Sequence, residues 1–103
     1  MSVKVIIKRI VPEGRAEELE PLLREMRAQA MRQPGYICGE TLRRVDKPDE
    51  YLVIGTWESV EDWDRWATSQ ARNEVQGKME MLLGITTECA VFHYGSARQA
   101  YDS

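Results

Sequence analysis

The chain has 103 residues, a net charge of −3 and a charged fraction of 30%, a composition typical of one soluble globular domain. The negative charge and the lack of a basic stripe with interleaved aromatic residues argue against nucleic-acid binding. No apolar run approaches the roughly 20 residues that span a bilayer, and the start of the chain lacks the pattern of a signal peptide. We therefore expect a cytoplasmic protein with no nucleic-acid or membrane partner.

The first half of the chain predicts a strand, a helix and a second strand. Residues 3–11 are rich in β-branched side chains and carry apolar residues on both faces of the predicted strand. Apolar residues recur at helical spacing through residues 15–33, and the Gln-Pro-Gly turn at residues 33–35 predicts the end of this helix. Residues 36–45 are mostly polar with weak alternation, which is typical of an edge strand.

A hairpin loop and a third strand follow. Residues 46–50 are turn formers, and residues 51–57 are nearly continuous in apolar character, which favours a central strand. Ser59 comes directly after this strand, with Asp62 three residues later. That spacing predicts a helix that begins with Ser59 as its N-cap.

This helix is interrupted before the last strand. A polar junction at residues 68–70 separates it from a second helical stretch at residues 71–83, which Gly84 ends. Residues 85–94 predict the fourth strand. We expect one domain over residues 1–95 and a short polar tail over residues 96–103.

The predicted element order is βαββαβ, an α+β fold of ferredoxin-like topology. Right-handed crossovers then give a four-stranded antiparallel sheet in the order 4-1-3-2, with the helices on one face. The opposite face would carry bare apolar surface, so we expect a second copy to cover it in a homodimer.

The two cysteines, Cys38 and Cys89, have no metal-binding or redox spacing. We expect free, partly buried thiols. The predicted strand order places them on opposite edge strands, beyond the reach of a disulfide.

Several short motifs together resemble the antibiotic biosynthesis monooxygenase family. The sequence QPGY at residues 33–36 is followed by a hairpin, by TWES at residues 56–59, and by a helix that carries tryptophan. The resemblance extends over residues 3–95 and implies a dimeric α/β barrel. It also implies an oxygenase that uses no metal or organic cofactor and holds an aromatic substrate between the sheet and the second helix.

A related branch of that family degrades haem, and the resemblance argues against this role here. The haem site of that branch has an Asn on the first strand, a Trp on the second helix and a His ten residues after that Trp. Trp66 matches the Trp, but Gln76 stands at the His position and Ile7 at the Asn position. An amide is not a usual haem ligand.

Trp66 is the candidate that the resemblance favours most for the substrate pocket, although an aromatic residue at helical spacing is also a normal core residue. Trp63 is the better candidate for a core anchor. The only histidine is a weak candidate for a catalytic base, with an interface or core position as the alternative. The predicted substrate-binding residues are Trp66, Asn73, Gln76, Met79 and Ile7, and the candidate base is His93.

Three functions remain open from the sequence. The first is a cofactor-independent monooxygenase that acts on a small aromatic or quinol-type substrate. The second is a protein that binds a small molecule without turnover, and the third is a structural or regulatory dimer with a closed interior. The acidic residues at the start of the second helix suit the helix dipole and do not predict a metal site.

Overall fold

The structure is a computed structural model that describes residues 1–95. Its elements confirm the predicted ferredoxin-like topology, with the interrupted helix present as two separate helices. The predicted tail at residues 96–103 lies outside the described residues. In chain order the elements are β1 (Val3–Ile10), α1 (Ala16–Ala30), β2 (Tyr36–Arg43), β3 (Glu50–Trp57), α2 (Val60–Ala67), α3 (Gln70–Leu83) and β4 (Thr86–His93).

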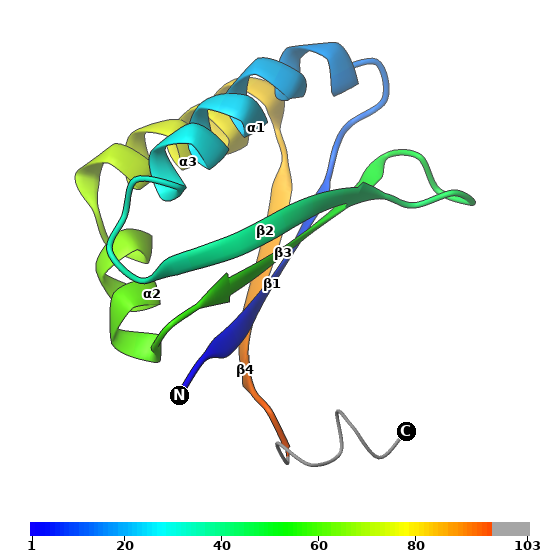
Figure 1. Cartoon of the computed structure of the whole chain (residues 1–103). Coiled ribbons are helices and arrows are strands. Elements are labelled where there is room, and N and C mark those ends of the chain that lie inside the picture. Colours follow the sequence, from blue (N-terminus) through cyan, green and yellow to red (C-terminus); the bar gives the residue numbers. More distant parts are fainter. Residues whose placement is uncertain (96–103) are drawn as a thin grey trace.

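The four strands form one antiparallel sheet in the order β2-β3-β1-β4, which is the predicted order read from the other edge. Helices α1 and α3 lie across one face of this sheet, and α2 lies near the end of β3 (Figure 1). The opposite face carries no helix. The two faces of the sheet therefore have different surroundings in a single chain.

Strand β1 is central and shows strict alternation of burial. Val3, Val5, Ile7 and Arg9 face the helices and are buried, while the residues between them are half-buried on the other face. A strand places every second side chain on the same face, so Arg9 continues the row of apolar core residues. Its side chain is only 1% exposed.

Two serine caps explain why the predicted helix is interrupted. The Ser59 hydroxyl oxygen accepts a hydrogen bond from the Asp62 backbone N–H at 3.1 Å, which confirms the predicted N-cap of α2. Ser69 does the same for the N–H of Arg72 at 3.2 Å and begins α3. The polar junction is thus the N-cap of a new helix, which fixes Arg72 in the first turn of α3.

The Pro-Gly turn before β2 packs directly against the start of α2. Gly35 has φ of 88°, a conformation that favours glycine. A Cβ atom added there would lie 2.3 Å from the Asp62 Cγ atom. The Gly35 carbonyl also accepts a hydrogen bond from the N–H of Glu58 at 2.8 Å. The QPGY and TWES motifs are therefore two sides of one contact that holds α2 in place.

Cys38 and Cys89 are free thiols on the opposite edge strands β2 and β4, as the strand order predicts. The prediction that they are partly buried is wrong, because both side chains are exposed in the single chain. Each edge strand pairs with another strand on one side only, so its residues keep more contact with solvent.

Candidate functional site

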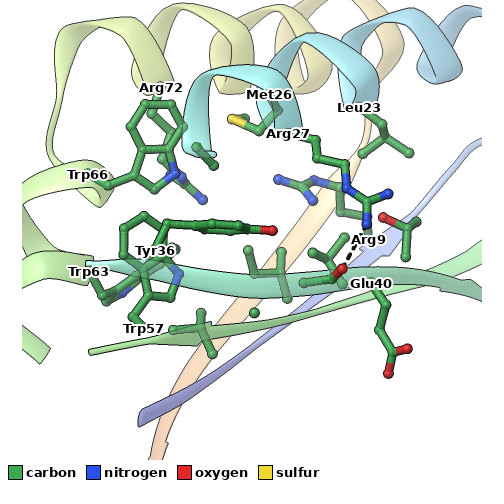
Figure 2. Close-up of a pocket in the computed structure, with 17 residues that line it drawn as sticks. Arg9, Leu23, Met26, Arg27, Tyr36, Glu40, Trp57, Trp63, Trp66 and Arg72 are labelled. Atoms are coloured by element: carbon green, nitrogen blue, oxygen red, sulfur yellow. Dashed lines mark hydrogen bonds between the residues drawn. The ribbon is translucent and has the colours of Figure 1, made fainter. Parts of the chain in front are cut away.

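A cavity of about 70 Å³ lies between α1 and the helix-facing side of the sheet (Figure 2). Strands β1, β2 and β3 supply its floor, and α1, α2 and α3 supply its roof and walls. A volume of this size holds a few water molecules, so a flat ligand of two or three rings fits only if the cavity opens further. The family resemblance implies a pocket between the sheet and the second helix, whereas α1 supplies most of the roof of this cavity, with Trp63, Trp66 and Arg72 in its walls.

The floor of the cavity has no side chains where two glycines face each other. Gly39 on β2 pairs with Gly55 on β3. A Cβ atom added at Gly39 would lie 2.8 Å from the Tyr36 hydroxyl oxygen, and one added at Gly55 would lie 3.3 Å from the Trp57 Nε1 atom. The two glycines therefore let aromatic side chains lie close to the strands, and they leave the space above the strands open.

Four aromatic side chains, Tyr36, Trp57, Trp63 and Trp66, form what we call the aromatic wall. Tyr36 meets Trp57 edge to face with ring centroids 5.4 Å apart, and Trp57 meets Trp63 in the same way at 5.7 Å. Edge-to-face pairs stabilise a fold beyond the burial of their area. The Tyr36 hydroxyl points into the cavity (Figure 2).

Two buried arginines, Arg9 from β1 and Arg72 from α3, also line the cavity, and we call them the arginine pair. The Arg9 Nη2 atom donates a hydrogen bond to the Gln76 Oε1 atom at 3.0 Å. The Arg72 guanidinium lies over the Trp63 ring, 5.4 Å from its centroid. The Nε atoms of both arginines are buried and have no hydrogen-bond partner within the described chain.

The electrostatics of the arginine pair are unfavourable in the single chain. Burial, and then repulsion by Arg72, lower the pKa of Arg9 from its usual value to about 10. Burial also lowers the pKa of Arg72. Cys89 and, to a smaller extent, Glu80 act in the opposite direction on both pKa values, but among residues 1–95 no carboxylate forms an ion pair with either arginine. At neutral pH the cavity therefore contains two guanidinium charges without a counter-ion.

An exposed arginine crosses the mouth of the cavity. The Arg27 Nη2 atom on α1 donates a hydrogen bond to the Gly39 carbonyl oxygen on β2 at 2.7 Å (Figure 2). A second, shallower hollow beyond it shares Leu23, Arg27 and Thr41 with the cavity. The Tyr51 hydroxyl lies there, buried and without a hydrogen-bond partner in the described chain. Movement of the Arg27 side chain would join the two spaces.

The structure brings only some of the predicted site residues to the cavity. Trp66 and Ile7 line it, so their predicted role in substrate binding agrees with their position and stays a prediction. Met79 is fully buried in the hydrophobic core. Asn73 is exposed, because it follows Arg72 on α3 and so faces away from the sheet.

Gln76 and His93 also lie elsewhere than predicted. Gln76 is buried, but it acts on the cavity through a neighbour: it accepts from Arg9 and donates to the Thr87 hydroxyl at 3.0 Å. His93 is exposed near the end of β4, paired with Val3, and does not line the cavity. Distance from the cavity argues against His93 as a base there. The sequence predicts no candidate base other than His93.

From the sequence, Arg72 is one of the polar residues near Trp66 that could orient a substrate, but Arg9 and its approach to Arg72 were missed. Two patterns contained the signal. Arg9 follows three apolar residues at strand spacing on the face that becomes the core. Arg72 begins the buried stripe of α3, which continues through Val75 and Met79. Arginine is seldom buried unless an acidic group pairs with it. An arginine at a position whose spacing matches a row of buried apolar residues therefore predicts a buried charge that needs a partner.

The sequence profile of the antibiotic biosynthesis monooxygenase family matches residues 2–78. The chain belongs to this family. A comparison with curated protein sequences gives no match. The resemblance stated from the QPGY and TWES motifs is therefore confirmed.

Solved structures of similar fold agree with this assignment. SnoaB from Streptomyces nogalater, a cofactor-independent oxygenase, superposes with a TM-score of 0.82 at 23% identity, over 93% of this chain and 95% of that one. Rv0793 from Mycobacterium tuberculosis gives 0.81 at 17% identity, over 93% and 97%. A conserved protein from Methanosarcina mazei gives 0.82 at 16% identity, over 90% and 92%. At these identities the likeness establishes the fold.

Neither a membrane-spanning helix nor a metal-binding cluster is found among residues 1–95. Across residues 1–95, none of the helices combines the length and apolar character needed to cross a membrane. In that same part of the chain, no three His, Cys, Asp or Glu side chains gather in an arrangement that suits a metal ion. The prediction that the protein uses no metal or organic cofactor, and the prediction that it forms no haem complex, stay predictions.

Proposed function

We propose that this protein is a cytoplasmic, cofactor-independent monooxygenase that acts on a small, flat, electron-rich aromatic or quinol-type substrate. The observation that carries the proposal is the composition of the cavity: an aromatic wall and a glycine floor beside two buried guanidinium groups that lack a counter-ion. Aromatic side chains accept a flat ring, and preformed positive charge stabilises an anion that develops on it. Membership of the monooxygenase family supports the same reaction class.

The chemistry follows from the charge of the cavity. A substrate that loses a proton becomes a delocalised anion, and the arginine pair stabilises that anion and so lowers the pKa of the substrate. The anion gives one electron to dioxygen, and the resulting radicals combine to form a carbon–oxygen bond. Cleavage of the oxygen–oxygen bond converts a CH₂ group to a carbonyl, and the second oxygen atom leaves as water. Two substrate hydrogens and one dioxygen molecule balance this step.

The proposal does not require a general base in the cavity. Within the part of the chain that the structure describes, Glu40 is the only carboxylate residue that borders the cavity, and its side chain points away from it (Figure 2). With the substrate pKa lowered by two positive charges, water or hydroxide is a sufficient proton acceptor. Trp66 would stack on the substrate ring and the Tyr36 hydroxyl would donate a hydrogen bond to a substrate oxygen.

Oxygen consumption with a panel of anthrones and quinols tests the proposal. We expect turnover that survives a strong metal chelator and falls at least about tenfold in Arg72→Met, because one charge-assisted contact is worth roughly 1.5–3 kcal/mol. Arg32→Met removes an exposed arginine next to the QPGY turn and serves as the matched control. Turnover at the wild-type rate in Arg72→Met would contradict the proposed role of the arginine pair.

A second candidate is a binding protein without turnover, and one observation favours it. Among residues 1–95, none of the side chains that point into the cavity is a carboxylate or a histidine, so proton removal has no assigned acceptor in this part of the chain. Tight binding of quinols without any oxygen consumption would support this alternative. The third possibility, a dimer with a filled interior, is disfavoured by the presence of the cavity.

We also propose that the protein acts as a homodimer, with a second copy against the helix-free face of the sheet. Support comes from apolar side chains on that face. Leu42 and Phe92 are 45% and 52% exposed, and Ile6 pairs with Ile54 between them. An obligate interface buries more than about 1,000 Å² in total. Sedimentation equilibrium should give twice the mass of one chain, and a monomer at micromolar concentration would contradict the proposal.

A further inference from the structure

We propose that Arg9 and Arg72 form a carboxylate subsite, so that the ligand of this cavity is an aromatic carboxylic acid. The inference rests on the proposed function in that it assigns the substrate class of the same cavity. The observation behind it is independent of the reaction: both guanidinium groups are buried and have no ion-pair partner among residues 1–95.

The first argument is the balance of charge. Arg9 is 1% exposed and Arg72 is 8% exposed, and neither forms an ion pair among residues 1–95. Buried charges in proteins are normally paired, because a lone buried charge loses its hydration without compensation. A neutral ligand would leave both charges uncompensated. A phenolate or enolate alone would compensate one of them, and an added carboxylate would compensate the second.

The second argument is the geometry of the free donors. Gln76 accepts from Arg9 Nη2 and is itself fixed by its hydrogen bond to Thr87, so the Arg9 guanidinium is held in place. Its Nε atom is left buried and unpartnered, and the Nε atom of Arg72 is in the same state. An arginine binds a carboxylate through two adjacent N–H donors, commonly including Nε. Each arginine therefore keeps an N–H donor that no atom of residues 1–95 satisfies.

The third argument is what lies beside the subsite. The Arg72 guanidinium packs over the Trp63 ring, which in turn contacts Trp57. Both rings and both arginines border one cavity (Figure 2). A ligand with a carboxylate at the arginine pair would place its ring against the aromatic wall. An inorganic anion would fill only the polar part and leave the apolar space empty.

Isothermal titration calorimetry with two matched probes tests the inference. The probes are 2-naphthoate and 2-naphthamide, which have the same ring system and differ in charge. Neither reacts with dioxygen in the proposed manner, so binding is measured apart from turnover. We expect the carboxylate to bind about 10- to 100-fold more tightly than the amide, because hydrogen bonds from a guanidinium to a charged carboxylate are stronger than those to a neutral amide.

Variants locate the effect at the arginine pair. Arg72→Met should remove most of the preference for the carboxylate, and Arg9→Met, made separately, should do the same. Arg32→Met, which changes an exposed arginine, should keep the preference. Because Arg72→Met removes a buried charge without an ion-pair partner, we expect this protein to melt at or above the wild-type temperature, so lost binding would not reflect unfolding.

Each other outcome overturns the inference. Equal affinity for the two probes, a preference that survives in Arg72→Met, or no binding of either probe would each contradict it. Sulfate that binds as tightly as 2-naphthoate would identify a general anion site instead. Failure here is separable from failure of the proposed function: turnover of neutral anthrones together with equal probe affinities would leave the oxygenase standing and remove only the carboxylate subsite.

Discussion

The aromatic wall and the arginine pair line the same cavity, but the aromatic rings pack against one another whereas the arginines lack ion-pair partners within residues 1–95. Tyr36, Trp57 and Trp63 contact one another edge to face, so this region completes its own packing. Arg9 and Arg72 are equally buried, yet each keeps a donor without a partner. A region that satisfies itself stabilises the fold. A region left unsatisfied costs stability and is explained best by a ligand that supplies what is missing.

The largest expected effect is in the aromatic wall. Trp63→Ala should lower the free energy of unfolding by about 3–5 kcal/mol, because it removes a ring that packs on both Trp57 and Arg72. Trp66→Ala should cost clearly less because, although both rings line the cavity and are buried, the Trp66 ring forms no edge-to-face pair or cation–π contact within residues 1–95. Urea unfolding of both variants measures the difference. Equal losses would show that Trp66 is an ordinary core residue.

The glycine floor gives the next effect in size. Gly39→Ala should cost about 1–3 kcal/mol, because the new Cβ atom would lie 2.8 Å from the Tyr36 hydroxyl oxygen and force that ring to move. In a Tyr36→Phe background the clash is relieved, so the same substitution should cost less. A double-mutant cycle from thermal or urea unfolding checks this. An unchanged cost in the Phe background would place the strain elsewhere.

The mouth of the cavity should respond least. Arg27→Ala removes an exposed hydrogen bond to the Gly39 carbonyl, so the loss of stability should stay within about 1 kcal/mol. Ligand association should become faster because nothing then crosses the mouth. Stopped-flow quenching of tryptophan fluorescence measures the rate, with Arg24→Ala on the same helix as the control. Slower association in Arg27→Ala would mean that Arg27 attracts the ligand and does not block it.

The order of strands and helices was readable from the sequence because it depends on local signals. Apolar spacing predicts the strands and helices, Ser59 marks the start of α2, and Gly84, with φ of 68°, ends α3. These features act over a few residues. Handedness of the crossovers then leaves one arrangement of the sheet.

The cavity could not be read in the same way, because it depends on contacts between distant residues. The pairing of Gly39 with Gly55 follows from the register of β2 on β3, and that register shifts between Tyr36 and Cys38. Strand alternation predicts that Arg9 faces the core, but only the folded chain shows that no carboxylate meets it there. Gln76, which stands where a haem ligand would be expected, proves to hold Arg9 in place.

The most direct test of an unsatisfied arginine pair is to satisfy it from within the chain. Gln76→Glu keeps the size of the side chain and places a carboxylate oxygen where the amide oxygen now accepts from Arg9 Nη2 at 3.0 Å. Differential scanning calorimetry with and without 2-naphthoate is the measurement, and Asn73→Asp, which also converts an amide to a carboxylate but at an exposed position of α3, is the control. We predict a gain in stability of about 1–3 kcal/mol without ligand and loss of the stabilisation by 2-naphthoate. A less stable variant that still responds to 2-naphthoate like the wild type would contradict the account.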